Sequence, residues 1–198
     1  MGDVRLENAF FALAARMRNI RRWGLMRNSF EENLLEHAQI TAVLAHALAV
    51  IRRDVFGRSA DPDRAAAAAL FHDMSEILTG DLPTPVKYLN EDIRRSYKAV
   101  ESRAEAQLLL LLPEEMRPAY GELLRGGEGE VHELVKAADK LAAYIKCIEE
   151  LRAGNQEFRS AEKQIRQTLE ASELPEVPYF IERFLPAFGM TLDELTGS

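Results

Sequence analysis

The sequence predicts an all-α protein, and two observations support this prediction. Apolar residues recur every three or four positions through most of the 198-residue chain, as they do on one face of a helix. No stretch shows the sustained alternation of apolar and polar residues that a half-buried strand requires. Because 47% of the residues are hydrophobic and 29% are charged, the chain can bury a sizeable core, and we expect residues 1–198 to form a single domain.

Helix-ending and helix-starting residues divide this pattern into eight helices. Asp61-Pro62 supplies an N-cap followed by proline at the first helical position, whereas Gly126-Gly127 and Gly154-Asn155 end helices. Prolines at positions 83 and 85 predict a loop. The expected helices cover residues 4–20, 30–53, 62–72, 90–112, 113–124, 130–153, 156–171 and 175–185.

The pattern within each helix indicates which side is buried. In the first helix, the short apolar run at residues 9–15 is preceded by acidic residues and followed by Arg16, which fits a buried face better than a signal peptide. In the helix at 30–53, His37 shares one face with the apolar residues that follow it, so it should point inward. The alanine run at 65–69 permits the close approach of a neighbouring helix. In the helix at 130–153, Asp139 borders an apolar stripe.

The charge and composition exclude several classes of partner. A net charge of -7 and a pI near 5.3 oppose long-range attraction to nucleic acid or anionic lipid, so we expect neither a nucleic-acid polymer nor a membrane as partner. The longest mainly apolar stretch, residues 40–51, is too short to cross a bilayer. The single cysteine, Cys147, cannot form an intrachain disulfide, which is compatible with the cytoplasm, and we expect a cytoplasmic protein.

An adjacent histidine and aspartate, His72-Asp73, follow the alanine-rich helix, with Glu76 one helical turn further on. An imidazole beside a carboxylate can offer a divalent metal two unlike ligands. His37, on an inward helix face, and Asp139, a carboxylate at the edge of a core that needs a partner, are the further candidates. Two histidines and two aspartates would suit one divalent ion such as Co, Mn, Zn or Fe(II).

The series His37, His72-Asp73 and Asp139, with each member on its own helix, resembles the HD superfamily of metal-dependent phosphohydrolases. Three further features resemble the bacterial 5'-deoxynucleotidase branch of that superfamily: Arg22-Trp23, the run Gly80-Asp81-Leu82-Pro83-Thr84-Pro85-Val86-Lys87, and residues 136–147. The resemblance extends from about residue 22 to the C-terminus. It implies an HD-domain helical bundle, a homodimer, and hydrolysis of deoxyribonucleoside 5'-monophosphates to deoxyribonucleosides and phosphate.

The resemblance also implies a role for particular residues. It implies metal ligation by His37, His72, Asp73 and Asp139, and catalytic roles for Glu76, Asp81 and Arg22. The substrate-binding residues that it implies are Arg22, Trp23, His37, Asp73, Asp81, Leu82, Pro83, Thr84 and Asp139. These roles suit the residue types, because a guanidinium matches phosphate geometry, an indole can limit a sugar, and a carboxylate that does not bind the metal can shuttle a proton.

The sequence departs from relatives beside the first histidine, where Leu34-Leu35 and Ala38 replace the small polar residues often found there. This change leaves the ligand but affects the groups that would fix its tautomer, and so the metal preference. Two other histidines are not expected to share the metal. His46 lies on the opposite helix face, as a packing or surface residue, and His132 lies about 10.5 Å along its helix from Asp139, exposed to solvent.

Two other functions are compatible with the same residues. The HD site could act on another nucleotide, such as a triphosphate or a ppGpp-like molecule, although no further basic cluster that would hold a longer phosphate tail is evident. Alternatively, the chain could be a nucleotide-sensing HD module without catalytic activity. Such degeneration usually removes a ligand or the catalytic acid, and neither is missing here.

Overall fold

The computed structural model describes residues 8–87 and 89–197, and these residues confirm the all-α prediction. They form helices and no strand, apart from one isolated antiparallel bridge between Arg21 and Asn33. The helices from the N-terminal half are α1 (Phe10–Ala14), η1 (Ala15–Asn19), α2 (Leu34–Val50), η2 (Ile51–Val55), α3 (Pro62–Phe71), α4 (Glu76–Thr79), α5 (Thr84–Lys87) and α6 (Glu91–Leu110). Those that follow are η3 (Glu114–Met116), α7 (Arg117–Leu124), α8 (Gly129–Arg152), η4 (Gln156–Phe158), α9 (Arg159–Glu170), α10 (Glu176–Arg183), η5 (Leu185–Gly189) and α11 (Leu192–Thr196).

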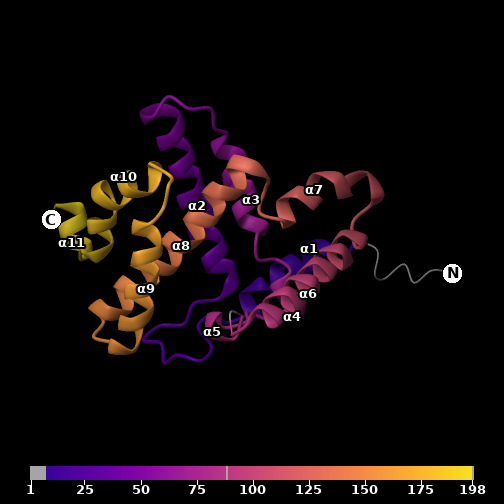
Figure 1. Ribbon diagram of the computed structural model, residues 1–198, viewed down its shortest axis with the longest axis horizontal. Helices are drawn as coiled ribbons and strands as arrows, with labels where there is room; N and C mark the ends of the chain where they lie inside the picture. The colour runs from indigo at the N-terminus through magenta and orange to yellow at the C-terminus, as the bar shows by residue number, and fades with distance from the viewer. Residues whose placement is uncertain (1–7, 88, 198) are drawn as a thin grey trace.

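Helices α2, α3 and α8 pack together at the centre of the bundle (Figure 1). One apolar cluster joins these three helices to α9, α10 and η5. A second cluster joins α1, η1 and the first turns of α2 to α6 and α7. The alanines predicted to allow close approach do so, because Ala65, Ala68 and Ala69 of α3 are fully buried against this centre.

Helix α2 begins at Leu34, four residues later than the pattern predicted, because Asn33 caps it. The Asn33 side chain accepts hydrogen bonds from the backbone of Leu35 and Glu36, and the Glu36 carboxylate accepts one from the Asn33 amide. This capping box satisfies backbone donors that the first helical turn leaves open. The residues before it are extended and pair with residues 20–22, so they are not available to the helix.

Other differences from the predicted helices occur near prolines and chain ends. The loop expected at the two prolines contains the short helix α5, with Pro85 in its first turn, where a missing N–H costs no helical hydrogen bond. The expected helices at 113–124 and 156–171 each begin with a short 3-10 helix, and α4 and α11 were not predicted. The part of the first expected helix that precedes residue 8 lies outside the described residues.

By length and composition alone the central helix could cross a membrane, whereas the expected apolar stretch at residues 40–51 was too short to do so. The helix from Leu34 to Val55 has 22 residues, and its most apolar 18-residue window has a mean hydropathy of 1.5. However, 56% of its most apolar window is buried inside the bundle, as in a core helix. Its apolar surface therefore has a partner in α3 and α8.

Candidate metal centre

Three helices bring together the four side chains that the sequence singled out as ligands. His37 lies on α2, His72 and Asp73 directly follow α3, and Asp139 lies on α8. One candidate ligand atom from each of the four residues lies within 4.8 Å of the others. Within this cluster, His37 Nε2 is 3.1 Å from Asp139 Oδ1, and His72 Nε2 is 3.0 Å from Asp73 Oδ2. The predicted inward orientation of His37 is confirmed, since its side chain is fully buried.

The orientation of His72 fits a metal ligand. Its Nδ1 donates a hydrogen bond to the Ala69 carbonyl oxygen at 2.7 Å, so Nε2 is the ring nitrogen that faces the carboxylates. That Nε2 is buried and lies 3.0 Å from Asp73 Oδ2 and 4.0 Å from Asp139 Oδ1. A buried nitrogen of this kind between two carboxylates is the arrangement that a divalent cation would satisfy.

The Nδ1 atom of His37, unlike that of His72, has no hydrogen-bond partner among the described residues. Its Nε2 faces the cluster, with Thr41 Oγ1 at 3.5 Å, but its buried Nδ1 has no partner within the described part of the chain. Among the described residues, its outer nitrogen therefore lacks the hydrogen bond that fixes most ligating histidines.

The pKa values of the clustered residues depend strongly on the charges of their neighbours. Burial would lower the pKa of His72, but Asp73 and Asp139 outweigh it and raise that pKa to about 9. Burial would likewise raise the pKa of Asp73, yet the neighbouring His72 lowers it to about 2. Burial and the nearby Arg22 lower the pKa of His37. The metal-free cluster thus holds a proton on His72 at neutral pH while His37 is neutral.

Glu76 begins α4 beside this cluster and is 6% exposed. Its Oε2 is buried and has no hydrogen-bond partner among the described residues. Burial, followed by the negative charges of Asp73 and Asp81, raises its pKa to about 9. At neutral pH the metal-free protein therefore carries a protonated carboxyl group one turn from the ligand cluster.

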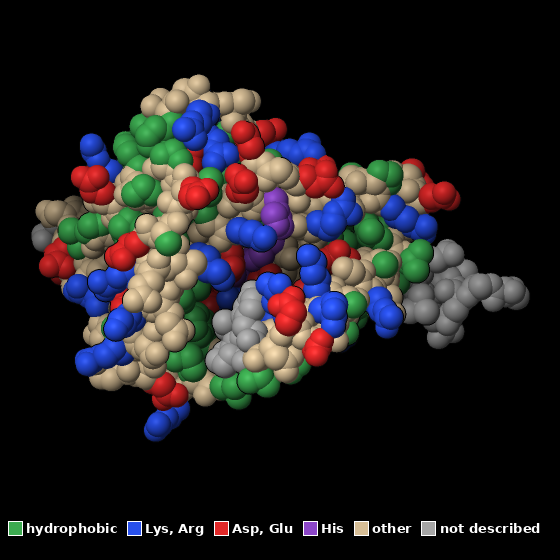
Figure 2. Space-filling view, viewed as in Figure 1, with side chains coloured by type: hydrophobic (Ala, Val, Ile, Leu, Met, Phe, Trp, Pro, Cys, Tyr) green, Lys and Arg blue, Asp and Glu red, His purple; other side chains and the backbone are tan. Residues whose placement is uncertain are grey.

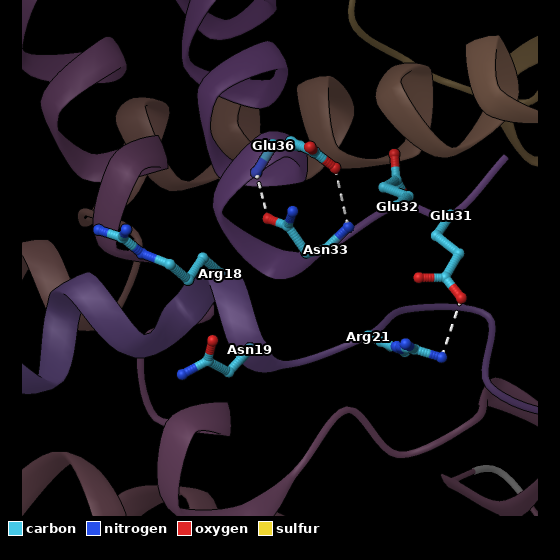
Figure 3. A pocket seen from close by; sticks show the side chains of 7 residues that line it. All are labelled: Arg18, Asn19, Arg21, Glu31, Glu32, Asn33 and Glu36. Atoms are coloured by element: carbon cyan, nitrogen blue, oxygen red, sulfur yellow. Dashed lines mark hydrogen bonds and ion pairs between the residues drawn. The ribbon is translucent and has the colours of Figure 1, made fainter.

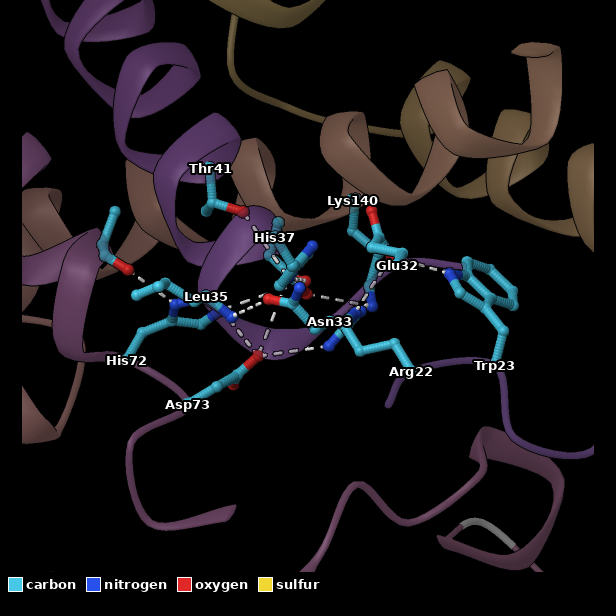
Figure 4. Close-up of polar contacts among 12 residues, drawn as sticks. Arg22, Trp23, Glu32, Asn33, Leu35, His37, Thr41, His72, Asp73 and Lys140 are labelled. Atoms are coloured by element: carbon cyan, nitrogen blue, oxygen red, sulfur yellow. Dashed lines mark hydrogen bonds and ion pairs between the residues drawn. The ribbon is translucent and has the colours of Figure 1, made fainter. Parts of the chain in front are cut away.

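Arg22 reaches the cluster from the segment before α2, and Trp23 lies beside Glu32 (Figure 4). Arg22 Nη1 donates to Asp73 Oδ2 at 3.4 Å, and Arg22 Nε donates to Glu32 Oε2 at 3.3 Å. Trp23 Nε1 donates to the same Glu32 oxygen at 2.9 Å, and its ring packs on Phe158 with the centroids 5.2 Å apart. Burial would lower the pKa of Arg22, but the surrounding carboxylates outweigh it and raise that pKa, so the guanidinium stays charged.

The segment after α4 approaches the same residues. Burial raises the pKa of the Asp81 carboxyl group, although the nearby Arg22 guanidinium and Trp23 backbone amide act to lower it. Leu82 and Pro83 are half-buried, and Thr84 begins α5, with its side chain outside what the structure describes. Acidic and basic side chains gather around the visible histidines near the centre of this face (Figure 2).

Some neighbours of the cluster were not predicted from the sequence. No sequence pattern marked Glu32, because its partner Trp23 belongs to another motif. Lys140 was also not predicted, although its Nζ lies 3.4 Å from Asp139 Oδ2. His46 is at the surface, as expected, 3.8 Å from Asp63. The expectation for His132 was wrong: it is half-buried, since Gly126, which itself packs against His72 at the end of α3, lies close to its ring.

Solved structures resemble this bundle over most of its length. An HD-domain phosphohydrolase from Listeria innocua matches with a TM-score of 0.79 and 24% identity, covering 90% of this chain and 87% of that one. The HD phosphohydrolase DatZ of cyanophage S-2L, solved with dA and one catalytic Zn²⁺ ion, matches with a TM-score of 0.62 and 22% identity over 88% and 95% of the two chains. The predicted HD-domain helical fold is therefore confirmed.

Sequence comparison identifies the family within this class. The model of the YfbR-like 5'-deoxynucleotidase family matches residues 9–188. A 5'-deoxynucleotidase of Vibrio parahaemolyticus is 47% identical over 96% of this chain and 99% of its own length. The 5'-deoxynucleotidase YfbR of Escherichia coli is 46% identical over 96% of both chains. The chain belongs to the YfbR-like 5'-deoxynucleotidase family, as its motifs predicted.

Proposed function

We propose that this protein is a metal-dependent 5'-deoxynucleotidase that hydrolyses deoxyribonucleoside 5'-monophosphates to deoxyribonucleosides and phosphate. The observation that carries the proposal is the cluster of four candidate ligand atoms within 4.8 Å of one another, with the Arg22 guanidinium at its edge. The names of the similar proteins from Vibrio parahaemolyticus and Escherichia coli agree with this activity.

His37, His72, Asp73 and Asp139 would hold one divalent ion, for which Co, Mn, Zn and Fe(II) are the candidates. Such an ion would supply an acidified water as nucleophile and would offset the charge of the phosphate under attack. Because His72 holds a proton in the metal-free protein, binding of the ion requires its release. Lys140 adds a positive charge beside Asp139 at the rim.

The remaining residues would position the substrate and move protons. Arg22, already oriented by Asp73, would bind the phosphate oxygens through its guanidinium. Glu76 would exchange a proton at its unpartnered Oε2, and Asp81 would give a proton to the leaving 5' oxygen. Trp23 would face the deoxyribose, while Leu82, Pro83 and Thr84 would form the adjacent wall of the nucleotide site.

The test uses metal-free protein to which Co, Mn or Zn is returned separately, with phosphate release measured for a panel of deoxyribonucleoside 5'-monophosphates. We expect release with at least one metal. Asp139→Ala should lose both metal and activity while remaining folded, whereas Asp63→Asn, which changes a carboxylate that is 99% exposed, should behave as the wild type. Absence of release with every metal and deoxynucleotide would refute the proposal.

The same experiment separates the two alternatives. Faster hydrolysis of a nucleoside triphosphate or a ppGpp-like nucleotide would favour a different substrate. Metal-dependent nucleotide binding without turnover would favour a sensing module. Both are less well supported. Arg22 and Lys140 are the cations that contact the ligand cluster among the described residues, which is few for a longer phosphate tail, and all four candidate ligands and Glu76 are present.

The homodimer, the cytoplasmic location and the single domain spanning residues 1–198 remain predictions. The family resemblance supports the homodimer, which sedimentation equilibrium would test directly. The charge of -7 supports a protein that does not bind nucleic-acid polymers, which a binding assay with duplex DNA would test.

A further inference from the structure

Glu32 is an enclosed carboxylate that joins the two residues expected to contact the substrate. Its side chain is 12% exposed. One of its oxygens, Oε2, accepts both the Trp23 indole N–H at 2.9 Å and the Arg22 Nε–H at 3.3 Å (Figure 4). Because both donors meet at one atom, a displacement of Glu32 would move the indole and the guanidinium together.

The backbone fixes Glu32 in this place. The Arg22 amide donates to the Glu32 carbonyl at 3.0 Å, and the Leu34 amide donates to the Ile20 carbonyl at 2.9 Å, so the two segments run side by side. Neighbouring side chains of an extended segment point to opposite sides. Accordingly, Glu31 points outward to Arg21, where the pair lies 2.9 Å apart with both side chains mostly exposed (Figure 3).

Glu32 also determines which donors remain for a ligand. Arg22 uses Nε for Glu32 and Nη1 for Asp73, whereas Nη2 makes no hydrogen bond among the described residues. The Trp23 ring is held on two sides, by Glu32 at its nitrogen and by Phe158 against the ring. Trp23 has a φ of 58°, a left-handed conformation that is rare for a bulky residue, so these contacts maintain a position that the backbone alone does not favour.

We propose that Glu32 is a positioning residue that holds the Arg22 guanidinium and the Trp23 indole in a fixed relation, and thereby sets the preference for 2'-deoxyribose over ribose. This inference rests on the proposed function. Rejection of a 2'-hydroxyl by an indole depends on where the ring lies relative to the sugar, and the phosphate held by Arg22 determines where the sugar lies. The carboxylate that links the two side chains therefore controls the space left at the 2' position.

The test compares Glu32→Gln with the same change at the neighbouring position, Glu31→Gln. The Glu32→Gln change keeps the size of the side chain but removes its charge, so that a neutral amide oxygen, a weaker acceptor for both donors, replaces the charged Oε2. We expect kcat/KM for dAMP to fall about 10- to 100-fold, as for loss of a charged hydrogen bond. We expect a smaller fall for AMP, so that the ratio of the two values drops at least several-fold. Glu31→Gln should leave both values near those of the wild type, because its partner Arg21 is exposed.

A second readout is independent of turnover, because Trp23 is the only tryptophan in the chain. Its fluorescence therefore reports on the indole held by Glu32. In Glu32→Gln we expect emission at longer wavelength and stronger quenching by acrylamide, since the ring would loosen from Phe158 toward solvent. Glu31→Gln should give the wild-type spectrum.

If a folded Glu32→Gln protein kept the wild-type ratio of kcat/KM for dAMP to kcat/KM for AMP, and also the wild-type Trp23 fluorescence, the inference would be overturned. If that variant does not fold, Glu32→Asp takes its place: it keeps the charge but draws the oxygens back by one methylene, and an unaltered ratio there would equally overturn the inference. If the wild type releases no phosphate from any deoxynucleotide, the proposed function and the selectivity role both fail, while the fluorescence comparison still decides whether Glu32 positions the indole.

Discussion

Replacing Glu76 by Gln should stabilise the metal-free protein at neutral pH while abolishing phosphate release. The Glu76 carboxyl group is buried, its Oε2 has no partner among the described residues, and its pKa is raised from 4.5 to about 9. A group whose pKa is raised by folding contributes stability that is complete below its unfolded pKa and is lost as the pH rises toward its folded pKa. The metal-free wild type should therefore lose stability from about pH 4.5 to about pH 9 through this residue.

The magnitude follows from the same shift. Each pH unit within that range costs about 1.36 kcal/mol of unfolding free energy, so the loss between about pH 4.5 and 7.5 is at most about 4 kcal/mol. Gln has a similar shape and does not titrate, so Glu76→Gln should escape this loss. The free-energy difference between variant and wild type should then grow with pH.

Urea unfolding of chelator-treated protein at about pH 5 and about pH 7.5 measures this difference. Glu31→Gln, at an exposed glutamate, serves as the control and should follow the wild type at both pH values. Stability curves of wild type and Glu76→Gln that run parallel from pH 5 to 8 would refute the reasoning. With metal restored, the variant should release no phosphate from a substrate that the wild type hydrolyses.

Three further predictions concern the metal, the buried ion pair and the cysteine. Metal affinity should rise about 10-fold per pH unit between about pH 6 and 8, because the metal must displace a proton from His72, whose pKa is about 9. Titration calorimetry would measure this affinity at each pH. An affinity that does not change with pH would contradict the prediction. Glu150→Ala should lower the unfolding free energy by about 3–5 kcal/mol in urea unfolding, because it leaves the buried Lys146 ammonium without its carboxylate and frees the Ser29 amide. A loss below about 1 kcal/mol would show that Lys146 finds another partner. Burial raises the pKa of Cys147 to about 12, so iodoacetamide should label it in urea but not in the folded protein, as mass spectrometry would record.

The sequence by itself determined the helical class, the family and the side chains that form the cluster. Helical periodicity depends on residues three and four apart, so the burial of His37 could be predicted from the apolar residues of its own helix. The ligand set could be predicted because the family resemblance connects motifs on three helices, and the structure places those side chains within 4.8 Å. Their roles in metal binding and catalysis remain predictions.

Only the tertiary structure decided how the residues around the cluster are held. The start of α2 at Leu34 depends on the pairing of its preceding residues with residues 20–22, a contact without a periodic signal. The half-buried position of His132 depends on the turn before α8 packing on the end of α3. Glu32 resembles its neighbour Glu31 in the sequence, yet one is enclosed between Arg22 and Trp23 while the other lies at the surface. The physical reason is that local patterns record the spacing within one element, whereas the partner of a side chain depends on which elements the fold brings together.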